Sequence, residues 1–501
     1  MRSLGLFSLA LLSTLTAASR SQQRPRGQDC AASADGGLAN SLTIINATPY
    51  SFHRSAVHSC QVGSWTLQDT PAVIEAGKSA TFSYRITRGG DAAADLSYLL
   101  NIDGKMSKKQ FNIHVQGRDR LVGYVISAEV SGGLTTAGHG SDQGRFQFGD
   151  IKDAFPQSGY PDVFVLSGNE TYGYGTVEPP VAWMSAMGPV LKKLSLRNLV
   201  IPASHDSGMS QTVDGIGVDA NTRTQDTNIY GQLVRGIRML DFRPHLGPND
   251  DDFRLAHFTK SFGAFGESLV DAMSDIKRFR REYPGELIVI DILPGLTRLK
   301  GPTSTPFTEK QCNDLLDTLE KGLPSLKTEY ELSIAPTDAT GLTAEPIDTF
   351  YKKEPSPILL RVPVDRKEWL GRQPVANGRK TTGTVASTFL PVTSKWSDTN
   401  GATVMSKDQK SFFDSKYTRN APFMSVFVLT LQGLENIPLG DSIRSLAFEA
   451  KKVLYTSAWD WSSVQRYPNM LQFDYVLDKQ VAAVAAAMNY QFAFARLWTG
   501  K

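Results

Sequence analysis

Two histidines, two carboxylates and an arginine lie within one short stretch of the 501-residue chain. His205 and Asp206 come first, Asp241 and Arg243 follow, and His257 ends the set. Breaking a phosphodiester requires a base for the attacking hydroxyl, an acid for the leaving oxygen and a cation against the charge on phosphorus. Histidines titrate near neutral pH, an arginine can hold phosphate oxygens through parallel hydrogen bonds, and carboxylates orient both. The set therefore favours phosphodiester chemistry.

The side chains that would do this chemistry are expected at the ends of short strands. The apolar run 199–201 precedes His205, the run 237–242 ends just before Arg243, and His257 closes a third run. In a β/α barrel the active site lies on the loops that follow the carboxyl ends of the strands. All three side chains should then face one mouth of such a barrel.

The rest of the chain from residue 190 onward alternates strand-like and helix-like segments. Residues 286–292, ELIVIDI, form a continuous apolar run of the kind found in buried parallel strands. Strands separated by helices over roughly 310 residues predict an α/β fold, a TIM-type β/α barrel that need not be regular. The polar, Gly- and Thr-rich segment 372–397 suits a long rim loop. Further strands are expected at residues 357–363, 424–431 and 470–476, and helices at residues 225–235, 267–281 and 481–488.

A different pattern fills the region before the barrel. Residues 41–168 carry short alternating apolar and polar runs separated by turn residues, which predicts an antiparallel all-β sandwich. Asp103-Gly104 is a hairpin signal between two of these runs. Residues 169–189 are rich in Gly, Pro and aromatic residues, so we expect them to be the interdomain linker, followed by the barrel at residues 190–501.

The first residues indicate export. Arg2 precedes an apolar run and a group of small residues, which predicts a signal peptide at residues 1–19 and a secreted, extracellular protein. The polar segment 20–40 is expected to be disordered. In an oxidising compartment Cys30 and Cys60 are the plausible disulfide pair, which leaves Cys312 unpaired. Two glycosylation sequons, at Asn46 and Asn169, are compatible with secretion.

The charge balance argues against nucleic acid as a partner. Lys and Arg number 53 against 50 Asp and Glu, so the formal charge of +3 provides no strongly positive field. The chain has no CxxC motif or Cys/His cluster, so a structural zinc site is not supported.

The segments IPASHDSG, RGIRMLDFRP, RLAHF and PGELIVIDI, in this order, resemble the X-box of phosphatidylinositol-specific phospholipase C. The likeness is to PLC-like phosphodiesterases of the metal-independent bacterial type and to their secreted fungal branch, and it spans residues 196–292. It implies that no metal or other cofactor takes part, because Arg243 stands where calcium-dependent members carry a carboxylate ligand. The implied roles are His205 as general base, His257 as general acid, Arg243 as phosphate stabiliser, and Asp206 and Asp241 as orienting groups.

The same resemblance points to two later residues. Family members carry a carboxylate on one of the last strands that pairs with the base histidine, and Asp474 in LQFDYV matches it by context. Arg361 in PILLRVP matches a substrate-binding arginine that faces the phosphate or headgroup, although a rim ion pair is an equal alternative. A basic residue that contacts inositol in bacterial enzymes would fall near Leu293, which cannot serve that role. His245 is expected on a loop surface.

Substrate and activity remain open at this point. The resemblance implies a phospholipid or glycosylated-lipid phosphodiester as substrate and a peripheral membrane surface as partner, with cleavage through a cyclic phosphate. The alternatives are a metal-dependent glycerophosphodiester phosphodiesterase and an inactive lipid- or glycan-binding protein. The opening SLTIINATPYSF resembles fungal β-sandwich proteins of the aegerolysin type, which implies a lipid- or glycan-facing module. A covering domain that packs on the barrel is the alternative.

Overall fold

The computed structural model describes residues 38–499, with gaps at residues 87–91, 118–122, 138, 140–142, 152–159, 216, 248–251, 260–261, 294–295, 299–303, 334–338, 364–378 and 433–441. The predicted signal peptide and Cys30 lie outside the described residues. Leu38 opens the first strand, so the expectation of disorder over residues 20–40 is wrong for its last three residues. Cys60 is disulfide-bonded, as predicted, and Cys312 is buried.

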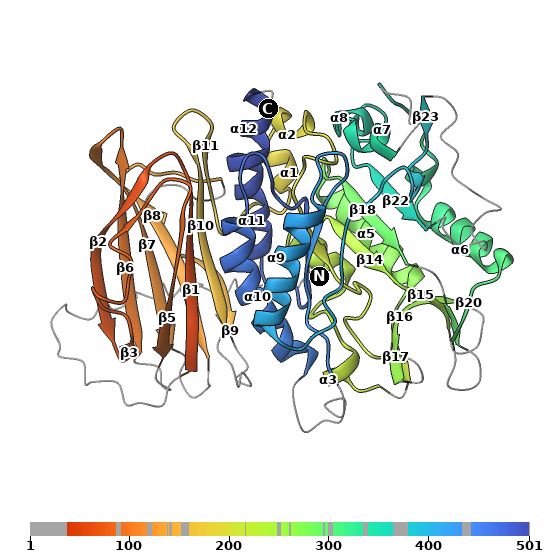
Figure 1. Cartoon of the computed structure of the whole chain (residues 1–501), viewed down its shortest axis with the longest axis horizontal. Helices are drawn as coiled ribbons and strands as arrows, with labels where there is room; N and C mark the ends of the chain where they lie inside the picture. Colours follow the sequence, from red (N-terminus) through yellow and green to blue (C-terminus); the bar gives the residue numbers. More distant parts are fainter. Residues whose placement is uncertain are drawn as a thin grey trace, which may run out of the picture.

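Two sheets form the N-terminal part of the molecule (Figure 1). One has five strands in the order β11-β10-β1-β5-β3, and the other has six in the order β4-β2-β6-β7-β8-β9. The strands are β1 (Leu38–Ala47), β2 (Ser51–Cys60), β3 (Val62–Gly63), β4 (Val73–Ile74), β5 (Ser79–Ile86), β6 (Ala93–Ile102), β7 (Lys105–Gly117), β8 (Tyr124–Ser131), β9 (Phe146–Ile151), β10 (Pro161–Asn169) and β11 (Gly173–Thr176).

Alternating burial explains how these two sheets pack. In β6 every second residue is buried, including Leu96 and Tyr98, as the period-two pattern predicts. Phe111 of β7 stacks on Phe164 of β10 at 4.6 Å between ring centroids, which joins the two sheets. The pairing is mostly antiparallel, but β1 and β10 run parallel, contrary to the all-antiparallel expectation.

The predicted hairpin and the predicted linker of this part can both be compared with the structure. The β6–β7 connection is the expected hairpin, because Asp103 and Gly104 have φ values of 51° and 78°. Residues 169–189 are not simply a linker, since they include β11, which pairs with β10, and helix α1. The chain therefore continues its first sheet past the expected boundary.

A seven-stranded parallel sheet holds the C-terminal part together. Its order is β24-β22-β18-β14-β12-β26-β25, with β24 and β25 as the end strands. The central strand β18 (IVIDI) is buried along its whole length, which is why its sequence does not alternate. β24 lies in the segment predicted as a rim loop. The strands are β12 (Ile201–Ser204), β14 (Met239–Phe242), β18 (Ile288–Ile292), β22 (Ile358–Val362), β24 (Thr384–Ala386), β25 (Met424–Phe427) and β26 (Met470–Phe473).

A separate six-stranded sheet lies beside the parallel one in the order β13-β17-β16-β15-β19-β20. Its β15, β16 and β17 pair antiparallel, so the run that ends at His257 is not a strand of the parallel sheet. A two-stranded sheet pairs β21 (Tyr330–Glu331) with β23 (Lys380–Thr381). The six strands are β13 (Asp214–Gly215), β15 (Pro244–Leu246), β16 (Phe253–Thr259), β17 (Phe262–Ser268), β19 (Leu296–Arg298) and β20 (Ser304–Pro306).

Helices cover the parallel sheet. In α5, Ser268 caps the N-terminus by accepting a hydrogen bond from the Asp271 N–H, and Met273, Ile276 and Phe279 form its buried face. No helix in the described ranges is long and apolar enough to cross a membrane. The helices are α1 (Trp183–Ala186), α2 (Pro189–Lys192), α3 (Asp219–Thr222), α4 (Ile229–Val234), α5 (Leu269–Glu282), α6 (Glu309–Gly322), α7 (Ala339–Ala344), α8 (Asp348–Tyr351), α9 (Ala402–Lys416), α10 (Ile443–Asp460), α11 (Gln480–Met488) and α12 (Phe494–Thr499).

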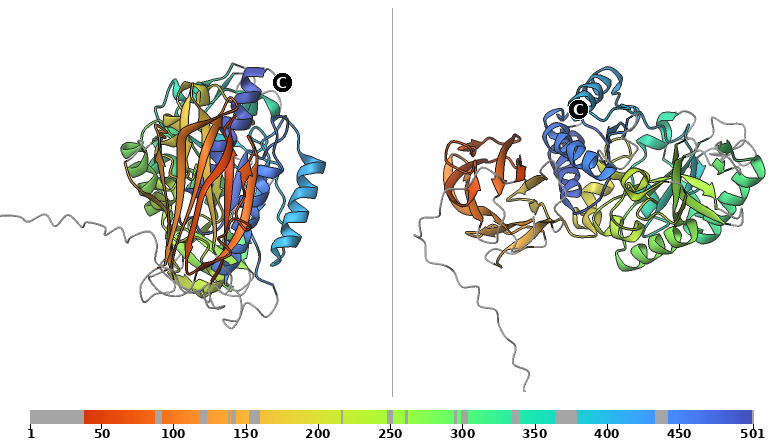
Figure 2. Two further views of the ribbon diagram at one scale, coloured as in Figure 1. Left: turned by 90° about the vertical axis from the view of Figure 1, so that its left-hand side faces the viewer. Right: turned by 90° about the horizontal axis from the view of Figure 1, so that it is seen from below.

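Helices α10 and α11 join the two parts of the molecule (Figures 1 and 2). The Gln480 side chain of α11 accepts a hydrogen bond from the Val163 N–H at 2.7 Å, and the Trp459 indole of α10 donates to the Gly77 carbonyl at 3.2 Å. The strand side of this contact belongs to the five-stranded sheet. The N-terminal sheets therefore pack directly on helices of the C-terminal part.

Candidate active site

The register of the parallel sheet brings three of the predicted side chains to one edge. Ser204, the last residue of β12, lies opposite Leu240 in β14 and Phe473 in β26. The residue after each of these three therefore sits in one row at the carboxyl end of the sheet. That row is His205, Asp241 and Asp474.

His205 is held between a carboxylate and a guanidinium. Its Nδ1 atom is 2.8 Å from the Oδ1 atom of Asp474, and its Nε2 atom is 2.6 Å from the Nη2 atom of Arg243. Arg243 donates in the second contact, so Nε2 accepts and the ring proton lies on Nδ1, where it is donated to Asp474. The predicted pairing of Asp474 with His205 is present, and the Nε2 lone pair has the form that a general base requires.

Arg243 is the cation at the centre of the site. Its Nη2 atom is 3.0 Å from the Oδ2 atom of Asp241, and its Nη1 atom is 3.4 Å from the Oδ2 atom of Asp206. Burial alone would lower its pKa, but Asp241 and Asp206 raise the pKa above the usual arginine range. Burial likewise opposes ionisation of Asp241, yet Arg243 and His205 bring its pKa below the ordinary value. The Arg243–Asp241 pair therefore remains charged.

Asp206 occupies a strained turn directly after His205. Its φ is 43°, in the left-handed region that non-glycine residues rarely adopt. Its backbone N–H donates to the Oδ2 atom of Asp241 at 3.0 Å. Both Asp206 carboxylate oxygens are buried without a hydrogen-bond donor among the described residues, and Oδ2 has Arg243 and His257 as ionic neighbours. Burial raises its pKa to about 7 in spite of Arg243.

His257 reaches the site from the antiparallel sheet. The Ala256 N–H donates to the Arg243 carbonyl at 3.0 Å, which fixes β16 next to the end of β14. The Nδ1 atom of His257 lies 3.0 Å from the Thr222 carbonyl oxygen and 3.9 Å from the Oδ2 atom of Asp206. Burial and the charge of Arg243 lower the pKa of His257 to about 4. The structure thus brings His257 to the predicted place by a route that differs from the predicted one.

A glycine lets the His205 loop approach this second sheet. A Cβ atom on Gly208 would lie 2.2 Å from the Cβ atom of Leu255 in β16. Any other residue would push the loop away from β16. The glycine of IPASHDSG therefore has a packing reason, and it keeps His205 near His257.

Arg361 lies farther along the same edge, in an ion pair. Asp291 of β18 is the register partner of both Asp241 and Arg361, so the row of charged groups continues across the sheet. The Nη1 atom of Arg361 is 2.6 Å from the Oδ1 atom of Asp291, and its Nε atom donates to the Leu390 carbonyl at 2.8 Å. Burial raises the pKa of Asp291, and Arg361 opposes that shift. This geometry matches the rim ion-pair alternative, and the substrate-binding role stays a prediction.

Three neighbours of the site were missed in the sequence. Trp396 places its ring centroid 4.8 Å from that of His205 and is 40% exposed. Thr222 contributes its backbone carbonyl, and Asp291 contributes the carboxylate that pairs with Arg361. The aromatic residue within the predicted rim segment was an available signal, whereas the other two contacts depend on the fold.

His245 is buried, contrary to the expected loop surface. It lies in β15, and its Nδ1 atom is 3.2 Å from the Arg243 carbonyl. Burial lowers its pKa to about 4. His245 is therefore a buried residue of β15, the strand that follows Arg243.

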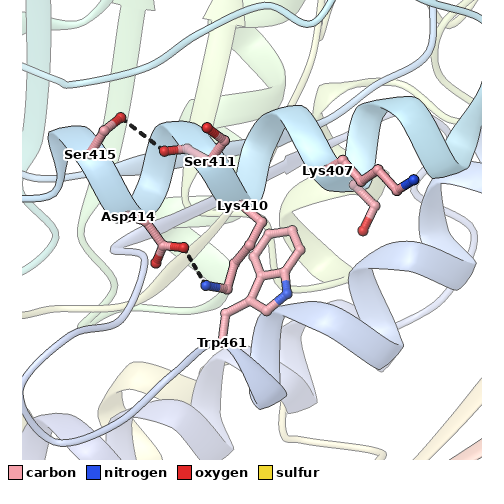
Figure 3. A pocket seen from close by; sticks show the side chains of 7 residues that line it. Lys407, Lys410, Ser411, Asp414, Ser415 and Trp461 are labelled. Carbon is pink, nitrogen blue, oxygen red and sulfur yellow. Dashed lines mark hydrogen bonds and ion pairs between the residues drawn. The ribbon is translucent and has the colours of Figure 1, made fainter.

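A surface groove lies away from this site, along α9. Figure 3 shows Lys407, Lys410 and Asp414 of α9 beside Trp461, and none of the catalytic candidates lines this groove. In the described residues, no cluster of three His, Cys, Asp or Glu side chains is arranged to hold a metal ion.

Curated relatives share part of this chain. The human PI-PLC X domain-containing protein 2 is 31% identical over 131 residues, which cover 22% of this chain and 42% of that protein. The bovine PI-PLC X domain-containing protein 3 is 30% identical over 134 residues, 22% of this chain and 40% of that protein. This stretch of the chain is similar to PI-PLC X-domain proteins. The chain spans about two fifths of the length of these X-domain relatives, and no family model matches it.

Two solved phosphatidylinositol-specific phospholipases C also align with this chain. The enzyme from Staphylococcus aureus is 15% identical, with a TM-score of 0.42 over 62% of this chain and 97% of that chain. The enzyme from Listeria monocytogenes is 14% identical, with a TM-score of 0.42 over 62% of this chain and 100% of that chain. The predicted resemblance to PI-PLC X-domain proteins is confirmed, whereas its bacterial-type and fungal refinements stay predictions.

Proposed function

We propose that this protein is a phosphodiesterase of the phosphatidylinositol phospholipase C type. The observation that carries the proposal is the convergence of His205, Arg243 and His257, with Asp474 bonded to the first. A base, a cation and a second imidazole around one point are what intramolecular cleavage of a phosphodiester requires. The name of the X-domain relatives supports phosphatidylinositol-type lipids as the substrate class.

The first step is removal of a proton from a hydroxyl next to the phosphate. In the ligand-free site, Arg243 donates to the Nε2 atom of His205. A bound phosphate draws this guanidinium onto its own oxygens and frees Nε2 for the hydroxyl. His205 takes the proton, the hydroxyl oxygen forms a bond to phosphorus, and Asp474 stabilises the resulting imidazolium.

The second step is protonation of the leaving oxygen by His257. In the empty site the Nδ1 atom of His257 donates to the Thr222 carbonyl, and burial together with Arg243 lowers the pKa of the ring to about 4. The negative charge of a bound phosphodiester offsets Arg243, which raises the pKa of His257 and favours a second proton, taken up from solvent, on its Nε2 atom. The bond from phosphorus to the leaving oxygen breaks as that oxygen receives the proton. The products are a cyclic phosphodiester and an alcohol, diacylglycerol for a phosphatidylinositol substrate.

The reaction as proposed needs no metal ion. The Arg243 guanidinium lies between Asp206, Asp241 and His205 and fills the place of a catalytic cation. Activity in excess chelator is the expected result. A requirement for calcium or magnesium would favour the glycerophosphodiester phosphodiesterase alternative instead.

The finer architecture belongs to this proposal too. We assign the parallel sheet and its helices to a β/α barrel at residues 190–501, with an accessory β-sandwich at residues 41–168. We further propose export through a signal peptide at residues 1–19 and action at a membrane surface. The disulfide at Cys60 supports an oxidising compartment.

Of the two glycosylation sequons, only that at Asn169 suits a glycan. Asn46 is fully buried, and its Nδ2 atom donates to the Tyr50, Ile74 and Glu75 carbonyls. Asn169 lies at the end of β10, where its Oδ1 atom accepts from the Thr171 N–H. A glycan on secreted protein is therefore expected at Asn169.

Phosphorus NMR of phosphatidylinositol vesicles incubated with the full-length protein in excess chelator tests the proposed function. We expect a cyclic phosphodiester resonance and release of diacylglycerol. His205→Ala and His257→Ala should each abolish both, while His58→Ala, at a largely exposed histidine of β2, should not. Absence of both products from the wild-type protein would overturn the proposal in its lipid form. Wild-type activity in His205→Ala and His257→Ala would overturn the assigned chemistry.

A further inference from the structure

Each of the two turns that carry the base and its carboxylate contains a strained residue. Asp206 follows His205 with φ of 43°, and Tyr475 follows Asp474 with φ of 53°. Left-handed non-glycine residues persist where the surroundings hold them in place. The 2.8 Å contact between His205 and Asp474 therefore depends on what holds these two turns.

Thr224 is bonded to both strained residues. Its carbonyl oxygen accepts a hydrogen bond from the Tyr475 N–H at 2.8 Å, and its hydroxyl donates to the Asp206 carbonyl at 2.9 Å. The three residues come from segments far apart in the chain. Thr224 thus links the two turns, one through its hydroxyl and the other through its carbonyl.

Gln225 makes a second link of the same kind. Its Nε2 atom donates to the His205 carbonyl at 2.7 Å, and its Oε1 atom accepts from the Val476 N–H at 3.2 Å. The side chain is fully buried, so water does not compete for these bonds. Both of these partners are backbone groups.

The linking segment is itself anchored. The N–H groups of Thr224 and Gln225 both donate to the Met209 carbonyl at 3.1 Å. From the opposite side, the buried Nζ atom of Lys451 in α10 donates to the Tyr475 carbonyl at 2.5 Å. Tyr475 is therefore bonded at both its N–H and its carbonyl.

We infer that Gln225 and Thr224 are positioning residues that set the distance between the general base His205 and Asp474. This inference rests on the proposed function and deepens it. Neither residue is bonded to the side chains of the catalytic set, so both act through the backbone of the two turns. Loosening these turns should weaken the His205–Asp474 bond while leaving the charged groups that bind phosphate in place.

Gln225→Met tests the inference because it keeps the length of the side chain and removes both hydrogen bonds. We expect kcat to fall about 10- to 100-fold with KM within about twofold of wild type, since small misplacements of reacting groups mainly affect the chemical step. Thr224→Val, which removes only the hydroxyl, should cause a smaller loss of the same kind. It also keeps the test valid if the first variant does not fold.

Gln480→Met is the matched control. Gln480 is also buried and also joins a backbone N–H to a backbone carbonyl, but in the contact between α11 and the N-terminal sheet. This control should lower the unfolding temperature without changing kcat. If it lowers kcat as much as Gln225→Met does, or if Gln225→Met folds and keeps full kcat, the inference is wrong.

A measurement without substrate separates this inference from the proposed function. Proton NMR should show a downfield resonance from the His205 Nδ1 proton, identified by its absence in His205→Ala. We expect this resonance to broaden or disappear in Gln225→Met and to persist in Gln480→Met. Its persistence in Gln225→Met would overturn the positioning role whether or not the wild-type protein cleaves phosphodiesters. If the resonance is lost in Gln225→Met as expected but the wild-type protein cleaves no phosphodiester, only the proposed function would be overturned.

Discussion

The Nδ1 atom of His205 lies 2.8 Å from the Oδ1 atom of Asp474, although 269 positions separate the two residues in the chain. The contact exists because β12 and β26 are neighbours in the parallel sheet and end in register. The bond fixes the tautomer in which Nδ1 carries the proton and Nε2 accepts. A late strand thereby completes a site whose other members come from residues 205–257, early in the C-terminal part of the chain.

Asp474→Asn should nearly abolish turnover while leaving the fold intact. The amide NH₂ group can donate a hydrogen bond to Nδ1, which stabilises the tautomer with its proton on Nε2. In that tautomer Nε2 has no lone pair and cannot act as the base. By analogy with other aspartate–histidine pairs, we expect kcat to fall about 100- to 10,000-fold with little change in KM. Asp460→Asn, at an exposed aspartate that accepts from the Ser79 hydroxyl, is the control. Turnover within a few fold of wild type in Asp474→Asn would contradict the orienting role.

The sequence was sufficient to predict the members of the site but not all of their positions. His205, Arg243 and Asp241 follow strands of the parallel sheet, so the rule for carboxyl ends places them correctly. His257 escapes that rule because β16 pairs antiparallel with β15 and β17. A short apolar run does not reveal which sheet it will join, because that depends on contacts distant in sequence.

Two short edge strands, β24 and β11, are also not predicted by the sequence pattern. β24 has only three residues and lies in a polar, Gly- and Thr-rich segment, so its pattern is too short to signal a strand. β11 has four residues, GYGT, and was assigned to the linker for the same reason. His245 was misplaced because a lone polar residue does not reveal whether its strand is covered. In each case tertiary packing outweighs local composition.

Arg243→Lys should remove most of the activity although it preserves the charge. The two Nη atoms of Arg243 contact Asp206, Asp241 and His205, and a single ammonium group cannot reach the same positions. We expect kcat to fall about 100- to 1,000-fold, as for the loss of one donor to a developing oxyanion. Steady-state kinetics in excess chelator measure the effect. Arg254→Lys, in β16, is the control, and equal losses in both variants would argue against a special role for Arg243.

Arg361→Gln distinguishes an ion-pair role from a headgroup-binding role. Removing Arg361 leaves the Asp291 carboxylate buried without its cation, which should cost about 3 to 5 kcal/mol of stability. Asp291→Asn in the same chain should restore much of that loss. Urea unfolding of the two single variants and the double variant gives the coupling energy. A large increase in KM with unchanged stability would instead support contact with the headgroup.

Glu267 should make the protein less stable as the pH rises. It lies buried in β17, where its Oε1 atom accepts from the Ser210 hydroxyl at 2.5 Å and its Oε2 atom has no hydrogen-bond partner among the described residues. Burial raises its pKa from 4.5 to about 7, so the folded protein keeps this proton when the unfolded chain has lost it. The stability that the group contributes is fully present below about pH 4.5 and is lost as the pH rises through about 7.

Glu267→Gln isolates this effect from other groups that titrate in the same range. His257 acts in the opposite direction, because its lowered pKa makes the folded protein more stable as the pH rises from about 4 to 6.5. That contribution is common to variant and wild type and cancels in their difference. The variant should gain up to about 3 kcal/mol relative to wild type between pH 5 and pH 8, measured by urea unfolding. Glu329→Gln, at a side chain that is 69% exposed, is the control. A difference between Glu267→Gln and wild type that stays constant with pH would show that Glu267 is ionised in the folded protein throughout this range.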